Sequence, residues 1–414
     1  MRSKRLLIVG AGQEQVPLYR LALDMGLSVT GSDQNPGAPG FAFADRVLIA
    51  STRDPDATVR AALASHGERP ISGVITIAND APVTVAAAAL ALGLPGVSLH
   101  SARIAANKRL QYDLFRERGL NVPEGREVES PEDLDAFIGR SGLPVIVKPT
   151  DNRGARGVFR ITRRSDAAAL FARSRAMCDE GRVLAQKFVE GDQVSAEGLV
   201  LDGEALIAMF SGRNYEYLDR YAPHVIENGG WLPGRFSAGQ AQAMRAAMQS
   251  AAEAMGIENG PIKADLVLSG GQVTILEVTA RLGGGYAATD SIPIAAGIDL
   301  ARQAILQAVG EPVRREDLLP KPGQPVAIRF FFPEPGLIES VSGYEELSRH
   351  PWIVLKRLSL GPGDAVQAVT DHTRRGGCVM TVGATIDEAD ARARQAVSEV
   401  IFNTRRPGGH DGPV

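Results

Sequence analysis

One stretch, ILEVTARLGGG at residues 275–285, begins as an apolar strand, carries Glu277 and Arg281 inside it, and ends in three glycines. It follows KADLVL at residues 263–268 and the turn residues SGGQ. Two apolar runs joined by a short glycine turn are typical of an antiparallel β-hairpin. We therefore expect a hairpin, and we expect Glu277 and Arg281 on its second strand to have a functional role.

The hairpin predicts a pair of facing carboxylates. A three-residue loop centred on Gly271 would place Asp265 directly opposite Glu277, with their Cβ atoms roughly 5 Å apart. Lys263 shares the face of Asp265, and alternation gives the second strand one common face for four residues: Ile275, Glu277, Thr279 and Arg281. A hard cation such as Mg²⁺ would remove the repulsion between the two acids. Local salt bridges, or solvated charges on an exposed face, are the alternative interpretations.

Length and composition limit the classes of protein to consider. A chain of 414 residues predicts two to four packed units, and 44% apolar residues fit an α/β protein. The net charge of −3 favours neither a nucleic acid nor a membrane surface as partner. Cys178 and Cys378 predict two thiols in a reducing compartment rather than a disulfide. The first residues lack a signal-type apolar run, so we expect a cytoplasmic protein.

The N-terminal segment, residues 1–104, predicts a Rossmann-like α/β domain. Its apolar strands alternate with helical patterns, which is typical of a doubly wound parallel sheet; they lie at residues 5–10, 27–31, 46–50 and 73–77. The turn Gly10-Ala11-Gly12 invites a dinucleotide interpretation, but the third glycine of that motif is missing. An NAD(P)-dependent oxidoreductase therefore stays only as an alternative.

The remaining chain predicts mixed α/β and α+β structure. Residues 105–311 form one expected domain with a lid at about 120–185, and residues 325–403 form a small α+β subdomain after a linker. We expect residues 404–414 to be disordered. Two helices are expected between about 130 and 200, and others at 101–119 with Ser101 as N-cap, 240–256, 298–309 and 386–402.

A phosphate-binding loop is predicted at LPVIVKPTDNRGARGV, residues 143–158. A buried strand ends at Lys148, and the loop after it contains Gly154, Arg156 and Gly157. Such loops donate backbone N–H groups to phosphates, with basic side chains nearby. Lys108 is a second candidate phosphate contact, although a surface position would be its ordinary interpretation.

Two further segments are candidates for ligand contact. The strand-to-loop crossing at residues 182–203 could present backbone groups to an adenine, or it could be an ordinary sheet connection. The long stretch at residues 211–237 reads as an irregular loop of the kind that lines pockets, or as a surface loop. Its candidate substrate contacts are Arg213, Tyr217, His224 and Trp231, and Asp290 and Ser291 follow the glycine run.

In this order the pieces resemble the ATP-grasp superfamily of carboxylate–amine and carboxylate–thiol ligases. The resemblance covers essentially the whole chain, and NK at 107–108, IVKP at 146–149 and QKFVEG at 186–191 carry it together with the hairpin. It is closest to L-amino acid ligases and carbamoyl-phosphate-synthase-like proteins. The expected fold is a Rossmann-like domain, an ATP-grasp domain with a lid and an antiparallel-sheet core, and the C-terminal α+β subdomain.

The resemblance implies ATP and Mg²⁺, or Mn²⁺ in its place, as cofactors. It implies catalytic roles for Arg281 and Lys148. It also implies nucleotide contacts at Lys108, Lys148, Gly154, Arg156, Gly157, Gln186, Lys187, Val189 and Gln193, with Lys187 and Val189 acting through their backbone. The implied metal contacts are Asp265, Glu277 and Thr279. Two of these positions depart from the family pattern: Thr279 replaces an asparagine and Gln193 an acidic residue.

The implied reaction converts a carboxylate into an acyl phosphate, which an amine then attacks. Arg281 would stabilise the carboxylate and its phosphorylated form, and the N–H groups of Gly283 and Gly284 would approach an oxyanion of the substrate. The expected partners are a small-molecule carboxylate and an amine, and the resemblance is compatible with a homodimer. Two alternatives stay open: a biotin-carboxylase-like or carbamoyl-phosphate-type enzyme that uses bicarbonate, and a non-catalytic ATP-binding sensor.

Overall fold

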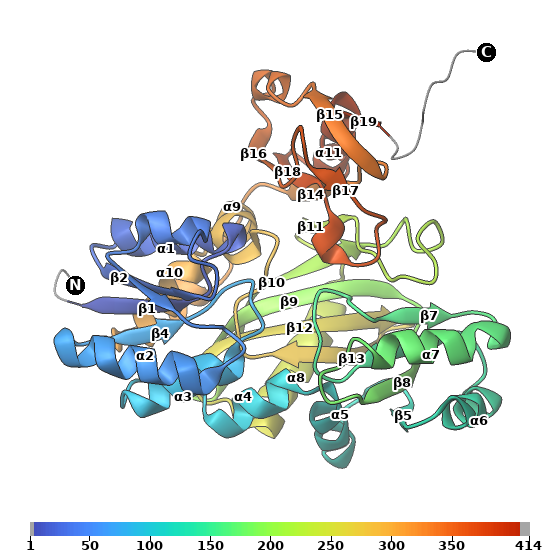
Figure 1. The fold of residues 1–414 in the computed structure, drawn as a ribbon. Coiled ribbons are helices and arrows are strands. Elements are labelled where there is room, and N and C mark those ends of the chain that lie inside the picture. The colour runs from blue at the N-terminus through green and yellow to red at the C-terminus, as the bar shows by residue number, and fades with distance from the viewer. Residues whose placement is uncertain (1–3, 406–414) are drawn as a thin grey trace. The chain divides into compact units, whose positions relative to one another are not determined.

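A computed structural model describes residues 4–405 of the chain (Figure 1). The chain divides into two compact units, each assembled from three segments. Unit 1 comprises residues 4–122, 194–210 and 235–323, and unit 2 comprises residues 123–193, 211–234 and 324–405. The domain boundaries expected from the sequence stay a prediction.

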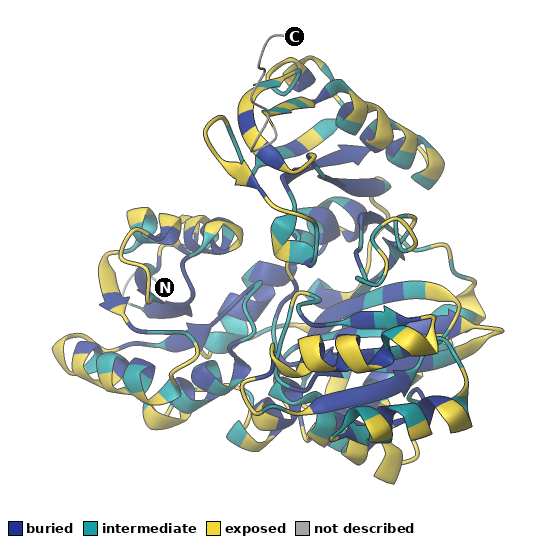
Figure 2. Ribbon diagram, turned by 45° about the vertical axis from the view of Figure 1, so that its right-hand side comes forward, coloured by how far each residue is buried: buried dark blue, intermediate teal, exposed yellow. Residues whose placement is uncertain are grey.

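The N-terminal part of unit 1 is a four-stranded parallel sheet with the strand order β3-β2-β1-β4. Its strands are β1 (Arg5–Val9), β2 (Ser28–Asp33), β3 (Arg46–Ile49) and β4 (Gly73–Ile75). The associated helices are α1 (Val16–Asp24), α2 (Pro55–Glu68), α3 (Pro82–Ala91) and α10 (Leu300–Ala308). The central strand β1 is buried throughout, which explains why its sequence is apolar at nearly every position (Figure 2). The predicted doubly wound sheet is confirmed.

The second part of unit 1 is an antiparallel sheet with the strand order β13-β12-β9-β10. Its strands are β9 (Asp192–Leu201), β10 (Glu204–Asn214), β12 (Gly260–Ser269) and β13 (Gln272–Thr279), and the ends of β9 and β10 extend into unit 2. Helix α8 (Ala238–Met255) contributes Met244, Met248 and Met255 to a core that also contains Ile275 and Val278 of β13. One face of β12–β13 is therefore apolar and the other is left for polar side chains.

The single helix predicted at residues 101–119 is wrong, because the structure has two. Helix α4 (Leu99–Ala106) begins after Ser98, whose hydroxyl accepts the N–H of Ser101, and α5 (Lys108–Glu117) follows. Asn107 is extended and its side chain accepts the N–H groups of Arg109 and Leu110, at 3.0 and 3.1 Å. Asparagine competes with the helical backbone for hydrogen bonds, so it ends one helix and caps the next.

Unit 2 contains a four-stranded antiparallel sheet with the order β5-β8-β6-β7. Its strands are β5 (Gly125–Val128), β6 (Val145–Pro149), β7 (Phe159–Ile161) and β8 (Val183–Lys187). Helices α6 (Pro131–Ser141) and α7 (Ala167–Arg175) pack against this sheet through Leu134, Phe137 and Phe171. This sheet and its two helices occupy the region expected to be the lid.

The C-terminal part of unit 2 has the strand order β11-β14-β18-β16, followed by helix α11 (Ile386–Glu399). These strands are β11 (Gly229–Leu232), β14 (Val326–Phe331), β16 (Ile353–Leu358) and β18 (Gly377–Val382). A separate small sheet has the order β17-β15-β19, from β15 (Gly336–Ser342), β17 (Ala365–Val366) and β19 (Ile401–Arg405). The strands near 326–332, 353–358 and 378–383 are confirmed.

Two details of the C-terminal prediction are wrong. The last helix ends at Glu399 rather than 402, because the chain continues as β19 and pairs with β15. That strand reaches Arg405, two positions into the predicted tail, and residues 406–414 of the tail lie outside the described residues.

The two cysteines agree with the sequence analysis. Cys178 and Cys378 are both buried free thiols, as predicted. Among the described residues, no helix is both long and apolar enough to cross a bilayer.

Candidate active site

The predicted pairing of Asp265 with Glu277 is confirmed by the strand register. The reason differs from the one predicted, because the turn has two residues, Gly270 and Gly271, both at positive φ. Such a turn in a regular ladder would place Leu276 opposite Asp265. A β-bulge at this point pairs Leu266 with Ile275 and Asp265 with Glu277, so the extra residue restores the carboxylate pair.

The bulge also corrects the predicted faces of the second strand. Ile275 pairs with Leu266 and lies in the apolar core, so it does not share a face with Glu277. Thr279 pairs with Lys263 on the polar side of the ladder. The polar face of the hairpin therefore begins at Glu277.

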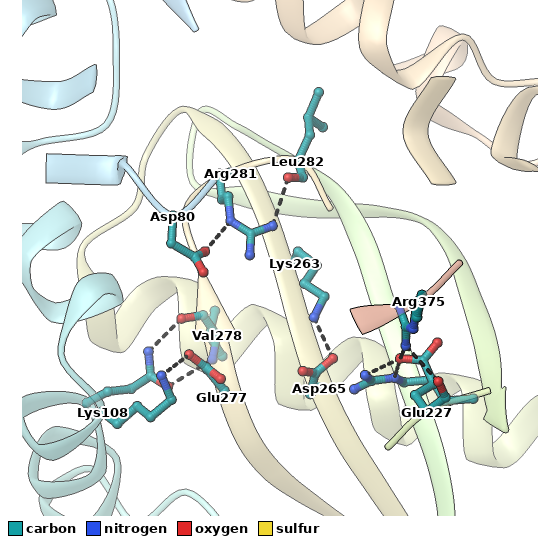
Figure 3. Close-up of polar contacts among 12 residues, drawn as sticks. Asp80, Lys108, Glu227, Lys263, Asp265, Glu277, Val278, Arg281, Leu282 and Arg375 are labelled. Carbon is teal, nitrogen blue, oxygen red and sulfur yellow. Dashed lines mark hydrogen bonds and ion pairs between the residues drawn. The ribbon is translucent and has the colours of Figure 1, made fainter. Parts of the chain in front are cut away.

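Each carboxylate of the pair is held by a lysine (Figure 3). Lys263 donates to Asp265 at 2.5 Å, and the ammonium of Lys108 lies 2.9 Å from the carboxylate of Glu277. Lys108 is the first residue of helix α5, immediately after the Asn107 cap. Lys108 is not the surface lysine of the ordinary interpretation, because only 11% of its side chain is exposed.

The donor set at the hairpin fits a hard divalent cation. Asp265 and Glu277 supply carboxylate oxygens from directly opposite positions, and the buried hydroxyl of Thr279 has no hydrogen-bond partner in the protein. Within residues 4–405, no group of three or more His, Cys, Asp or Glu side chains is arranged to hold a metal. Mg²⁺ commonly uses one or two carboxylates and completes its shell with phosphate and water oxygens, so two acids are sufficient.

Arg281 lies beyond the end of β13, where its guanidinium is fixed by two contacts (Figure 3). Its Nε donates to Asp80 at 2.5 Å and its Nη1 donates to the carbonyl of Leu282 at 3.0 Å. Burial, the largest single effect, would lower the pKa of Arg281, but the carboxylates of Asp80, Glu277 and Glu197 together outweigh it and the pKa is raised. The guanidinium therefore keeps its charge in a nearly closed environment.

The three glycines after Arg281 make room for carboxylates of the protein. The N–H of Gly283 donates to Glu197, and a Cβ at this position would lie 1.8 Å from a Glu197 oxygen. The N–H of Gly285 donates to Glu14 at 3.1 Å, and a Cβ at Gly284 would lie 2.7 Å from the same side chain. The N–H of Gly283 is thus used within the protein, and the predicted oxyanion contacts of Gly283 and Gly284 stay predictions.

Glu197 is a buried acid that the sequence analysis did not identify. It lies in β9, only 5% exposed, and its Oε2 has no hydrogen-bond partner in the protein. Burial raises its pKa to about 7, against the opposing effects of Lys263, the Gly283 N–H and Arg281. Glu197 lies on the face of β9 opposite to Val194, Ala196 and Val200, which pack in the core, so alternation alone gave no signal for its burial.

The predicted phosphate loop in unit 2 has the expected backbone. Lys148 lies in β6, 8% exposed, and Gly154 and Gly157 have φ values of 63° and 73°. The carbonyl of Gly154 accepts the N–H of His372 at 3.0 Å, and Nε of Arg156 donates within the loop. These positive φ values explain the two glycines, and the role of the loop in phosphate binding stays a prediction.

The predicted adenine contacts lie at the end of β8 and the start of β9. Gln186 is buried within the sheet, and Gln193 lies half-buried in β9. The N–H of Lys187 donates to Glu124 at 2.7 Å and its ammonium donates to Ser141 at 2.6 Å. The Lys187 N–H is therefore used within the protein, and the predicted backbone contacts of Lys187 and Val189 with adenine stay predictions.

The stretch at residues 211–237 is not an irregular loop throughout, because β10 continues to Asn214 and β11 follows. Its four candidate residues have separate surroundings. Arg213 pairs with Glu227 at 2.5 Å, Tyr217 packs on Tyr221 and Phe332, His224 packs on Phe159, and Trp231 lies in β11. Their roles in substrate binding stay predictions, as do those of Asp290 and Ser291.

Comparisons with known proteins cover three parts of the chain. Residues 20–96 match the ATP-grasp N-terminal domain and residues 105–285 match the ATP-grasp domain. Residues 329–405 match the L-amino acid ligase C-terminal domain 2.

Individual relatives are distant in sequence. The formate-dependent phosphoribosylglycinamide formyltransferase of Burkholderia vietnamiensis is 26% identical over 291 residues, which span 67% of this chain and 69% of that protein. The alignment with the same enzyme of Burkholderia cenocepacia spans about half of that protein, 47%.

Solved structures share the fold over nearly the full length. The L-amino acid ligase from Bacillus licheniformis has a TM-score of 0.83 at 21% identity, covering 98% of this chain and 100% of that one. Phosphoribosylglycinamide synthetase from Anaerococcus prevotii has a TM-score of 0.75 at 19% identity, covering 97% and 100%. The matches thus identify an ATP-grasp domain at residues 105–285, which contains the carboxylate pair, preceded by an ATP-grasp N-terminal domain.

Proposed function

We propose that the protein is an ATP-dependent ligase that joins a carboxylate to an amine and releases ADP and phosphate. The observation that carries this proposal is the polar end of the β12–β13 hairpin. Asp265 and Glu277 face each other there, and Arg281 follows four positions later with its charge preserved. A nucleotide sensor needs no charged group of this kind beyond its metal site.

We propose Mg²⁺ as the metal that binds with ATP, with Mn²⁺ as a substitute of similar ligand preference. Asp265 and Glu277 would hold it, with the Thr279 hydroxyl as a further oxygen. When bound, the metal neutralises charge on the transferring phosphoryl group. Lys263 and Lys108, which contact these acids, are then available to nearby anions.

The proposed chemistry has two steps. A carboxylate oxygen of the acid attacks the terminal phosphorus of ATP, and the bond to the ADP oxygen breaks. The amine then attacks the acyl carbon, the carbon–oxygen bond to phosphate breaks, and the amine loses a proton to the solvent. No nucleophilic side chain is needed, so the protein contributes orientation and charge.

Arg281 is the proposed catalytic residue for both steps. Guanidinium groups bind carboxylate and phosphate oxygens through paired N–H donors in a plane. Arg281 has five such donors, and its contacts with Asp80 and Leu282 use two. The other three are available to the acid, the acyl phosphate and the tetrahedral intermediate. Lys148 and the loop at Gly154–Gly157 are proposed to bind the phosphates of ATP.

We propose small-molecule acids and amines as partners, with amino acids as the first class to test because the C-terminal segment matches an L-amino acid ligase domain. A homodimer and a cytoplasmic location are proposed on the family resemblance and the thiol content. The size of the particle in solution tests the former.

Release of ADP from the purified protein with ATP and Mg²⁺ tests the function. We expect ADP only when an acid and an amine are both present, measured over a panel of amino acids in pairs. Turnover that depends on bicarbonate alone would instead indicate a carboxylase. Tight ATP binding without turnover for any pair would contradict the ligase and favour a sensor. Glu277→Gln and Arg281→Ala should both abolish turnover while the far-ultraviolet dichroism is unchanged.

A further inference from the structure

The N-terminal sheet of unit 1 has a topological switch point that the proposed function does not use. The strand order β3-β2-β1-β4 means that the chain leaves β1 in one direction for β2 and returns on its other side as β4. In open parallel sheets, the crevice outside the carboxyl ends of two such strands is the usual ligand site. Here the corresponding loops are Gly10–Gln15 after β1 and Thr76–Asp80 after β4.

This crevice contains the glycine stretch of the same chain. Ile77 and Leu282 form a parallel β-bridge, and the N–H of Ala78 donates to the Leu282 carbonyl at 3.3 Å. On the other side, Glu14 accepts the N–H of Gly285. Both loops of the switch point thus bind the segment that follows Arg281.

The glycines are what allow the close approach. A Cβ at Gly284 would lie 2.7 Å from the Glu14 carboxylate and 3.4 Å from Cβ of Ala78. The backbone of the segment therefore lies between the two loops, where a dinucleotide would need its pyrophosphate. Gly10 and Gly12 have other close neighbours: a Cβ there would lie 2.7 Å from the Asn79 side chain and 2.8 Å from that of Gln15, respectively.

The loop after β4 also presents Asp80 to Arg281. Ala78 has a φ of 54°, a left-handed conformation that non-glycine residues adopt at a cost. The chain bends there, and Asp80 accepts a hydrogen bond from Nε of Arg281 at 2.5 Å. The Arg281 side chain is 13% exposed and that of Asp80 is 27% exposed, so the pair is partly shielded from water.

We propose that the N-terminal domain is a positioning domain for the catalytic arginine: its switch-point crevice seats residues 282–285, and Asp80 is a positioning residue that orients Arg281. This inference rests on the proposed role of Arg281. It assigns no dinucleotide to the domain. Asp80 accepts from Nε and the Leu282 carbonyl accepts from Nη1, so the remaining Nη hydrogens are the ones proposed to bind the reacting anion.

The first test compares Asp80→Asn and Asp80→Glu with Glu68→Gln as a matched control. Glu68→Gln breaks the Arg46–Glu68 pair of the same domain, at 2.8 Å, far along the chain from the hairpin. We expect kcat for ADP release to fall about 100-fold in Asp80→Asn, with KM for ATP within twofold, because a misplaced group loses transition-state contacts. Asp80→Glu should restore part of kcat, and Glu68→Gln should change neither value.

A second readout needs no turnover. Phenylglyoxal labels accessible arginines, and the rate at Arg281 can be followed by mass spectrometry of the peptide. We expect at least fivefold faster labelling at Arg281 in Asp80→Asn than in the wild type or Glu68→Gln, at equal melting temperature.

The two readouts separate the two proposals. Faster labelling without any ligase activity in the wild type would contradict the proposed function and leave the positioning contact intact. Equal labelling rates, or a wild-type kcat in Asp80→Asn, would overturn the positioning role. Saturable binding of NADH to the wild-type protein would overturn the seating of residues 282–285 in the crevice.

Discussion

At the scale of single residues, the site depends on acids that hold other groups in place. Asp80 orients Arg281, while Glu197 and Glu14 accept backbone N–H groups of the glycine run. Glu197 differs from the others because it is buried and one of its oxygens has no protein partner. A buried carboxylate is costly when it is ionised, so its effect on stability should depend on pH.

Glu197→Gln should change the pH dependence of stability. Burial raises the pKa of Glu197 to about 7 from 4.5, so the folded protein binds more protons than the unfolded chain between these values. The free energy of unfolding therefore falls as the pH rises through this window, by roughly 3 kcal/mol once the pH is well above 7. The glutamine keeps an acceptor for the Gly283 N–H and carries no charge.

Urea unfolding at pH 5 and pH 8 measures this effect in the absence of metal. We expect Glu197→Gln to be close to wild type at pH 5 and more stable at pH 8. Glu204→Gln is the opposite control, because Arg315 lowers the pKa of exposed Glu204 and removal of its charge gives no gain at pH 8. If Glu197→Gln lost as much unfolding free energy between pH 5 and pH 8 as the wild type does, the raised pKa of Glu197 would be contradicted.

At the scale of elements, the hairpin shows what the sequence could predict. Asp265 and Glu277 were placed opposite each other from alternation and an assumed three-residue loop. The structure has a two-residue turn and one bulge, and the two differences cancel in the register. A bulge is not readable from an apolar run such as VTILEV, because every residue there suits either face.

Helix α5 illustrates the opposite case, where a small polar residue was overlooked. Asn107 divides the predicted helix and makes Lys108 its first residue, which brings the lysine to Glu277. Asp80, Glu14 and Glu197 could not be assigned because their partners are between 86 and 271 positions away along the chain. Strand and helix patterns report local structure, whereas these contacts depend on the tertiary fold.

Asn107→Ala should weaken ATP binding by loosening Lys108. Loss of a side-chain N-cap costs about 1 kcal/mol, and here the freed turn contains the lysine that contacts Glu277. Ser237→Ala removes the cap of α8 and is a control of similar cost without that lysine. We expect KM for ATP to rise about fivefold in Asn107→Ala and less than twofold in Ser237→Ala. Equal KM values for ATP in the two variants would contradict a role of the Asn107 cap in nucleotide binding.

At the scale of the whole molecule, the fold class and the family were predictable because short motifs occur in a fixed order. The parallel N-terminal sheet, the antiparallel strands and the C-terminal α+β part all followed from periodicity and glycine positions. Substrate contacts could not be predicted in this way. The four candidates Arg213, Tyr217, His224 and Trp231 each have separate neighbours in unit 2. Substrate identity depends on pocket shape, which residue types alone do not define.

The central claim is that a carboxylate of the substrate receives the terminal phosphoryl group of ATP. An acid whose carboxylate oxygens carry a heavy isotope tests this directly, with mass spectrometry of the phosphate released during ligation. If an acyl phosphate forms, each phosphate contains one labelled oxygen, because the later bond breakage is between carbon and oxygen. Unlabelled phosphate, or label found in AMP, would contradict the account.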